Sequence, residues 1–179
     1  MVNNLLTINL LELETEKNLM KEYSYTIPKK NSVIIVPNGG FIEPIKVSAT
    51  VSKKQEQTYL IEGLVETQLK LPCDRCLSLN TLEVKELFKK QVLVTNQEID
   101  LKEEDSEGFY RIPIGRLPLK ELLQEAIEFS IPSKFLCQKN CLGLCYNCGT
   151  NLNDGQCGCD KNDVDPRLAV LKKYYDKKK

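Results

Sequence analysis

The sequence predicts an α+β fold: an N-terminal antiparallel sheet or partly closed β-barrel, one packing helix, then a cysteine-rich segment with a short terminal helix. Three patterns lead to this prediction. Apolar and polar residues alternate through the first half, one later stretch has helical periodicity, and six of the eight cysteines fall between Cys137 and Cys159. At 179 residues, 41% of them hydrophobic, the chain is long enough to bury a core without covalent cross-links.

Alternation predicts the strands. Residues 44–53 place four apolar side chains on one side, and residues 58–71 continue the pattern after the polar connection 53–57, which suits a hairpin. Residues 81–95 predict a third strand, although two charged residues interrupt its apolar row. Two shorter apolar stretches, 5–13 and 31–37, are further strand candidates. Together these segments predict the antiparallel sheet or partly closed barrel.

Two predicted units follow from the rest of the pattern. Residues 1–132 form a strand-rich domain with an exposed acidic loop at 96–108 and a helix at 117–129, which has apolar residues at helical spacing and opens at Pro118. Residues 133–179 form the cysteine-rich segment, whose predicted terminal helix starts at Asp165 and Pro166. This segment is expected to be tied back to Cys73 and Cys76.

The cysteines are expected to bind metal. The first residues lack a basic stretch and carry three glutamates, so we expect neither a signal peptide nor a membrane span, and a cytoplasmic protein. Reducing compartments disfavour disulfides, so these spacings favour metal over a disulfide framework or unrelated buried thiols. Because the chain has no histidine, we expect closed structural zinc sites held by sulfur alone. Eight thiols suffice for two zinc ions.

Spacing favours one grouping of these ligands. The most local set is formed by Cys145, Cys148, Cys157 and Cys159. The remaining four are Cys73, Cys76, Cys137 and Cys141. Closing the long loop between the two halves of the second set costs only about 1.7 kcal/mol more than a short closure, because the cost grows with the logarithm of length. An interleaved ribbon, which pairs the first two cysteines of the chain with Cys145 and Cys148, remains an alternative.

Charge gives no general attraction to nucleic acid. The 25 basic and 25 acidic residues cancel, and eight thiolates (−8) with two zinc ions (+4) leave about −4. Any RNA contact would therefore need local patches. The candidates are Lys53, Lys54, Lys89, Lys90, Lys172, Lys173, Tyr174 and Lys177. The alternative for the last four is a helix with one buried tyrosine and a solvated lysine end.

The sequence does not favour an enzyme. There is no histidine to act as a base, no glycine-rich phosphate loop, and the acidic residues concentrate in a predicted loop. A thiol oxidoreductase using Cys73 and Cys76 is an alternative, but strand pattern follows this pair where a thioredoxin-like motif would begin a helix. We expect no small-molecule substrate.

Three blocks of sequence resemble the YceD family, the large ribosomal RNA subunit accumulation proteins of bacteria and plastids. The blocks are "LPCDRCL", "CLGLCYNCGTNLNDGQCGC" and "DPRLAVLKK". The matching positions are Cys73, Arg75, Cys76, Gly143, Leu144, Cys145, Cys148, Gly149, Asn151, Leu152, Asn153, Asp165, Pro166 and Arg167. One departure is Tyr146, where proline is expected and a slightly looser turn follows.

The resemblance implies a non-catalytic factor for the synthesis, processing or stability of 23S ribosomal RNA and for large-subunit assembly. The implied partner is a large-subunit precursor, either its 23S rRNA or an assembly or ribosomal protein. The alternative is a zinc-stapled protein adaptor that does not touch RNA.

Overall fold

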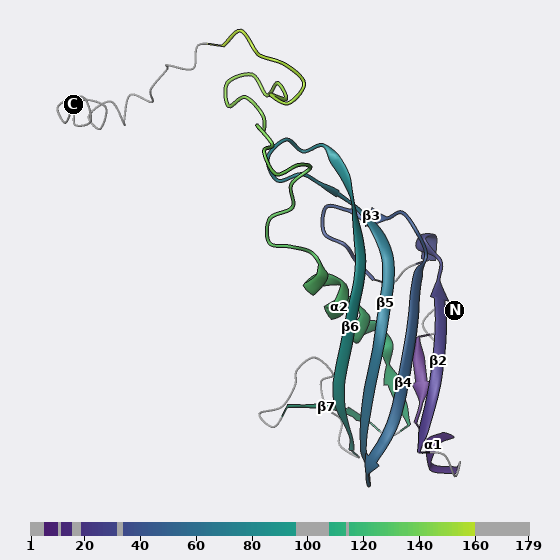
Figure 1. Ribbon diagram of the computed structural model, residues 1–179. Coiled ribbons are helices and arrows are strands. Elements are labelled where there is room, and N and C mark those ends of the chain that lie inside the picture. The colour runs from purple at the N-terminus through teal and green to yellow at the C-terminus, as the bar shows by residue number, and fades with distance from the viewer. Residues whose placement is uncertain are drawn as a thin grey trace, which may run out of the picture.

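The computed structural model describes residues 6–10, 12–15, 19–31, 34–95, 108–113 and 115–159 (Figure 1). Within these residues a six-stranded sheet is covered on one side by a helix and a small two-stranded sheet. The predicted terminal helix and nearly all of the predicted acidic loop lie outside the described residues, as do Lys172, Lys173, Tyr174 and Lys177.

Three long antiparallel strands form the middle of the sheet and confirm the predicted strands. They are β4 (Ile45–Gln55), β5 (Thr58–Pro72) and β6 (Leu79–Thr95). The pairing of β5 with β6 runs without a break from Thr58 opposite Leu93 to Pro72 opposite Leu79. Because side chains alternate between the faces of a strand, one row of each strand is buried and the other faces solvent.

The remaining strands make the sheet mixed and open. On one side β2 (Met20–Ile27) pairs with β4 along its whole length, and on the other β7 (Phe109–Pro113) pairs with β6 in parallel. The short β3 (Gly40–Phe41) pairs with β5 beyond the end of the β4 ladder. The order β2-β4-β5-β6-β7 leaves β2 and β7 at opposite edges, so the described strands show no closed barrel. The predicted antiparallel sheet is confirmed for β2, β3, β4, β5 and β6, with β7 as a parallel addition, whereas the alternative of a partly closed barrel is not shown.

The two shorter strand predictions hold only in part. Among the described residues of 5–13, the strand is β1 (Thr7–Asn9), paired with β8 (Arg116–Pro118), and the short helix α1 (Glu12–Thr15) begins at Glu12. In the range 31–37, Asn31 is the last residue of the 3-10 helix η1 (Lys29–Asn31), and the described residues 34–37 form no strand. There the side chain of Gln124 accepts from the N–H of Ile35 and donates to its carbonyl, both at 2.8 Å, so a side chain replaces the strand partner.

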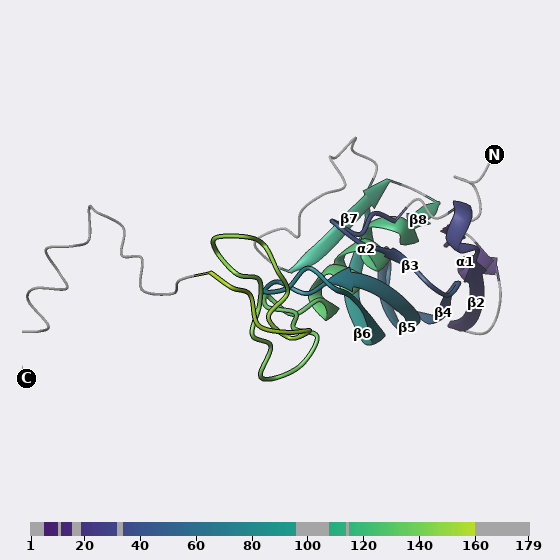
Figure 2. The ribbon, with the colours of Figure 1, turned by 90° about the horizontal axis from the view of Figure 1, so that it is seen from above.

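The predicted helix is present as α2 (Leu119–Ser130) and packs mainly on β6. Its buried residues are Leu119, Leu122, Leu123, Ala126 and Ile127. These are the residues that the helical periodicity selected, because positions three and four apart lie on one side of a helix. Figure 2 shows α2 and β8 on the same side of the sheet. No helix in the described part of the chain is long and apolar enough to span a membrane.

After α2 the chain runs to the hairpin that joins β5 and β6, at the end of the sheet (Figure 1). Backbone hydrogen bonds fix this approach: Asp74 donates its N–H to the carbonyl of Phe135 at 2.9 Å, and its carboxylate accepts from the N–H of Phe135 at 2.6 Å. The cysteine-rich segment is thereby placed against the hairpin that carries Cys73 and Cys76.

Candidate metal centres

The β5–β6 hairpin ends in a tight turn built around two cysteines, which we call the first knuckle (residues 73–78). The N–H of Leu77 donates to the carbonyl of Cys73, and the N–H of Cys73 donates to the carbonyl of Ser78, both at 2.9 Å. The N–H of Arg75 points back to the sulfur of Cys73 at 3.4 Å. Such N–H groups aimed at sulfur stabilise a thiolate.

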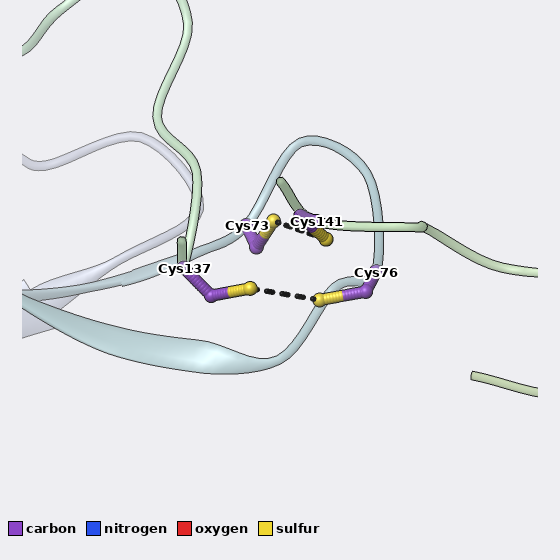
Figure 3. Close-up of side chains that lie close together, drawn as sticks. All are labelled: Cys73, Cys76, Cys137 and Cys141. Carbon is purple, nitrogen blue, oxygen red and sulfur yellow. Dashed lines mark hydrogen bonds between the residues drawn. The ribbon is translucent and has the colours of Figure 1, made fainter. Parts of the chain in front are cut away.

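Two further cysteines from the segment after α2 complete a first centre. Figure 3 shows Cys137 facing Cys76 and Cys141 facing Cys73, with sulfur separations of 3.6 and 3.8 Å. All four sulfur atoms lie within 4.8 Å of one another. A disulfide needs about 2.05 Å between its sulfurs. A tetrahedral zinc with Zn–S bonds of about 2.3 Å needs sulfurs about 3.8 Å apart, so the geometry fits a four-thiolate ion.

This first centre is buried and has its own small core. Cys73, Cys76 and Cys141 are 0%, 5% and 2% exposed, and Leu136 and Leu144 pack around them. The guanidinium of Arg75 donates to the carbonyl of Cys141 at 2.8 Å and so holds the two chain segments together. The centre therefore joins segments that are 61 and 68 residues apart in the sequence.

A second centre lies in the segment itself. The sulfur atoms of Cys145, Cys148, Cys157 and Cys159 also lie within 4.8 Å of one another. Only Cys145 is buried in this set, while Cys148 is exposed. All eight cysteines are among the described residues, and they form the grouping favoured from the sequence; the interleaved ribbon is not formed.

The turn from Cys145 to Thr150, the second knuckle, repeats the geometry of the first. The N–H of Gly149 donates to the carbonyl of Cys145 at 2.9 Å, and the N–H of Cys145 donates to the carbonyl of Thr150 at 2.8 Å. In each knuckle a hydroxyl two residues after the second cysteine bonds that sulfur, Ser78 at 3.4 Å and Thr150 at 3.1 Å. The sequence analysis missed these hydroxyls, although the pattern CxxCx[ST] occurs in both knuckles.

The pKa values in each set differ widely, so the four thiols of a set do not ionise together. Burial opposes ionisation of Cys73, but backbone N–H groups outweigh it and lower its pKa to about 6. Burial and hydrogen bonds to neighbouring thiols raise the pKa of Cys137 to about 12. In the second set, hydrogen bonds from Thr150 lower the pKa of Cys148 to about 6, whereas the contact with Cys148 and burial raise that of Cys159 to about 12. Four thiolates coexist at neutral pH only with a positive ion between them.

A left-handed turn holds the two knuckles side by side. Gly143 has φ +78°, and a Cβ there would lie 3.2 Å from the carbonyl oxygen of Arg75. The N–H of Leu144 donates to that same carbonyl at 3.1 Å. Glycine allows both the backbone conformation and the close approach. Arg75 and Gly143 thus have structural roles that spacing alone did not reveal.

The lysine candidates for RNA contact that the structure describes lie away from the two candidate metal centres. Lys53 and Lys54 are at the end of β4 that is opposite the cysteines, about 45 Å away at the rise of an extended strand. Lys89 pairs with Glu62 at 2.8 Å on the open side of the sheet, and Lys90 pairs with Glu125 of α2 at 2.8 Å. Lys53 lies opposite Tyr59 of β5 and Lys90 lies opposite Ile61, so these lysines share one end of the sheet, where Lys89 and Lys90 have acidic partners.

Comparison with known proteins identifies the family of this chain. Residues 61–174 match the family described as "Large ribosomal RNA subunit accumulation protein YceD". The chain is also similar to the Arabidopsis thaliana protein called "Large ribosomal RNA subunit accumulation protein YCED homolog 1, chloroplastic", at 25% identity over 156 residues. That match covers 72% of this chain and 47% of the relative, so the chain spans about half the relative's length. No solved structure matches. Since the family match contains both candidate metal centres and the hairpin that carries the first, this chain belongs to the YceD family.

Proposed function

We propose that this protein is a non-catalytic, zinc-stapled factor that supports the accumulation of 23S ribosomal RNA and, through it, assembly of the large ribosomal subunit. The observation that carries the proposal is the family match over residues 61–174, a region named for large ribosomal RNA subunit accumulation that contains all eight cysteines. The matched region of this chain also contains both four-cysteine sets and most of the β5–β6 hairpin.

Zinc is the proposed metal at both centres. Each set offers four sulfur ligands with spacings that suit a tetrahedral ion, and soft thiolates select zinc over hard cations. Zinc held by four thiolates supplies structural cross-linking, because it keeps no open position for water or substrate. The first knuckle closes a β-hairpin, whereas a redox-active CxxC pair is typically placed where a helix begins, which supports the structural role over the oxidoreductase alternative.

A protein contact is the second candidate for how this factor acts. The cysteine-bearing end, residues 73–80 and 133–159, carries three basic residues, Arg75, Lys134 and Lys139, and two acidic ones, Asp74 and Asp154. Its charge is +1, and two zinc ions on eight thiolates (−4) would make it −3. A negative surface repels phosphate, so a basic protein of the precursor suits this end better than naked RNA.

The role in RNA accumulation is tested by complementation. Cells lacking the protein would be supplied with the wild-type chain, with Cys73→Ser, or with Glu56→Ala as a control at an exposed position. We expect the wild type and the control to restore the ratio of 23S to 16S rRNA, and Cys73→Ser to restore it poorly. No change of this ratio upon loss of the protein would refute the proposed role.

The mode of contact is tested by capture of tagged protein at two salt concentrations, with and without nuclease. The defined readouts are large-subunit precursor RNA and purified basic large-subunit proteins added back one at a time. Direct RNA binding predicts that precursor RNA is lost as salt rises, because phosphate contacts release counterions. A protein contact predicts retention of one named large-subunit protein after nuclease treatment.

A further inference from the structure

One side chain links the two metal centres. Asn153 lies in the loop between Cys148 and Cys157, two ligands of the second centre, yet its side-chain amide donates to the sulfur of Cys141 in the first centre at 3.4 Å. A ligand of one centre is thus hydrogen-bonded by a residue whose loop is closed by the other centre. We propose that Asn153 couples the two centres, so that metal binding at the second centre strengthens metal binding at the first. The inference rests on the proposed function, in which both sets hold zinc.

The first step of the argument is that Asn153 is firmly oriented. Its side-chain oxygen accepts from the N–H of Leu142 at 2.8 Å and from the amide of Gln138 at 3.1 Å. Its side-chain nitrogen also donates to Asn151 at 2.7 Å. With the oxygen held by two donors from the segment between Cys137 and Cys145, the amide nitrogen is directed toward the sulfur of Cys141.

The second step is that the loop of Asn153 depends on the second centre. Residues 149–156 run from Cys148 to Cys157, so both ends of this loop are cysteines of the second centre, and the loop contacts the segment before Cys145. These contacts include the bridge between Leu144 and Asn151 and the bond from the N–H of Leu152 to the carbonyl of Gly143 at 2.9 Å. A metal ion at the second centre fixes both ends of this loop. The conformational entropy of the loop is then already lost when the first centre binds its own ion, so binding at the first centre costs less free energy.

The third step is chemical. A hydrogen bond from an amide N–H to a thiolate stabilises its negative charge and orients its lone pairs toward the metal. Outer partners of this kind typically change metal affinity by about 10- to 100-fold. Coupling between two binding sites is reciprocal, so the first centre must strengthen the second by the same factor.

The test uses the full chain, stripped of metal and titrated with Co²⁺, whose thiolate absorption reports binding at four sulfurs. Alkylation of the thiols left unprotected at each Co²⁺ concentration, read by peptide mass spectrometry, assigns the bound ion to the first or the second centre. Asn153→Asp retains an oxygen that can accept from Leu142 but removes the N–H donor to Cys141. We expect it to weaken Co²⁺ binding at the first centre by about 10- to 100-fold and at the second by much less. The control is Asn140→Asp, an exposed position next to Cys141 that adds the same charge near the first centre and should leave metal binding there within about threefold.

The coupling itself is tested by a double-mutant cycle. Cys157→Ser with Cys159→Ser removes the second centre, and we expect Co²⁺ affinity at the first to fall by about tenfold when Asn153 is present. In the Asn153→Asp background the same change should have no further effect. An equal fall in both backgrounds, or no fall in either, overturns the coupling while leaving the two zinc sites in place. Failure of the wild-type chain to bind Co²⁺ at all would instead overturn the zinc proposal, and this inference with it.

Discussion

The two knuckles have the same local chemistry and different surroundings. Both are a CxxC turn closed by two backbone hydrogen bonds and a hydroxyl contact to the second sulfur. The first is buried at the end of a 15-residue strand, and its ligands come from segments more than 60 residues apart. The second takes all its ligands from residues 145–159, and Cys148 is exposed. The comparison teaches that one CxxC motif can bring together distant segments of a fold or remain within a single loop.

The strongest way to break this comparison is to remove one ligand from the buried centre. Cys73→Ser should cost more than about 100-fold in metal affinity there, because a lost ligand exceeds the effect of a lost outer partner. It should also release residues 133–159 from the hairpin and lower the melting temperature of the whole protein. Metal content by mass spectrometry and thermal unfolding measure both effects. Full metal content with unchanged melting would contradict the cross-linking role.

The matched change in the exposed centre is Cys148→Ser. It should also remove one metal equivalent, yet it should leave unfolding of the sheet nearly unchanged, because the second centre contains no residue of β5 or β6. Limited proteolysis should cut within 145–159 and spare the sheet. If Cys148→Ser lowered the melting temperature as much as Cys73→Ser, the contrast between a fold-wide and a local cross-link would be wrong.

Alkylation of the metal-free protein separates burial from ionisation. Cys73 and Cys148 both have a pKa lowered to about 6, so both are largely thiolate at pH 7. Cys148 is exposed and Cys73 is fully buried, so we expect iodoacetamide to modify Cys148 faster by about tenfold or more. Peptide mass spectrometry gives the rates. Equal rates would show that burial does not protect the first knuckle.

The pH dependence of alkylation should differ between Cys148 and Cys159, because their pKa values are shifted in opposite directions. A lowered pKa means that the thiolate of Cys148 is already present above about pH 6, so its modification rate should level off near neutrality. The pKa of Cys159 is raised to about 12, so its rate should keep increasing through pH 9. A plateau for Cys159 below pH 8 would contradict the raised pKa that the contact with Cys148 and burial give this thiol in the metal-free chain.

The smallest expected effect concerns the residue after each CxxC pair. Gly149 has φ +73° and Leu77 has φ +60°, so the first knuckle holds a leucine in the left-handed conformation that glycine adopts without strain. Gly149→Leu should destabilise the second knuckle by about 1 kcal/mol, although a Cβ there meets no neighbour within 4 Å. Leu77→Gly should be near neutral, because relief of strain offsets the greater freedom of the unfolded chain. Chemical denaturation of the zinc-loaded variants measures both.

Local patterns in the sequence were sufficient for the long elements. The alternation in residues 44–53, 58–71 and 81–95 predicted β4, β5 and β6, because each strand buries one face and exposes the other. Helical spacing identified the buried side of α2 for the same reason. A comparable alternation in β2, where Tyr23, Tyr25 and Ile27 lie on the more buried side, was present but missed.

Pairings between distant segments could not be predicted from the sequence. Nothing local to residues 109–113 reveals that β7 pairs in parallel with β6, and this pairing keeps the sheet open. Residues 31–37 have the apolar content of a strand. The side chain of Gln124 in α2, however, hydrogen-bonds both the N–H and the carbonyl of Ile35, the groups that a strand partner would use. Whether such a segment becomes a strand depends on which partner the tertiary fold places beside it. Local propensity does not encode that partner.

The sequence by itself determined the ligand chemistry of this protein: eight cysteines, no histidine, and spacings that suit two four-sulfur sites. The tertiary structure decided where the two cysteine sets lie and what surrounds them. It placed Cys73 and Cys76 on a hairpin that meets the segment after α2, and it brought Asn153 to the sulfur of Cys141. The physical reason is that ligand type and short spacing are properties of the chain, whereas burial and long-range hydrogen bonds exist only after the sheet has brought distant residues together.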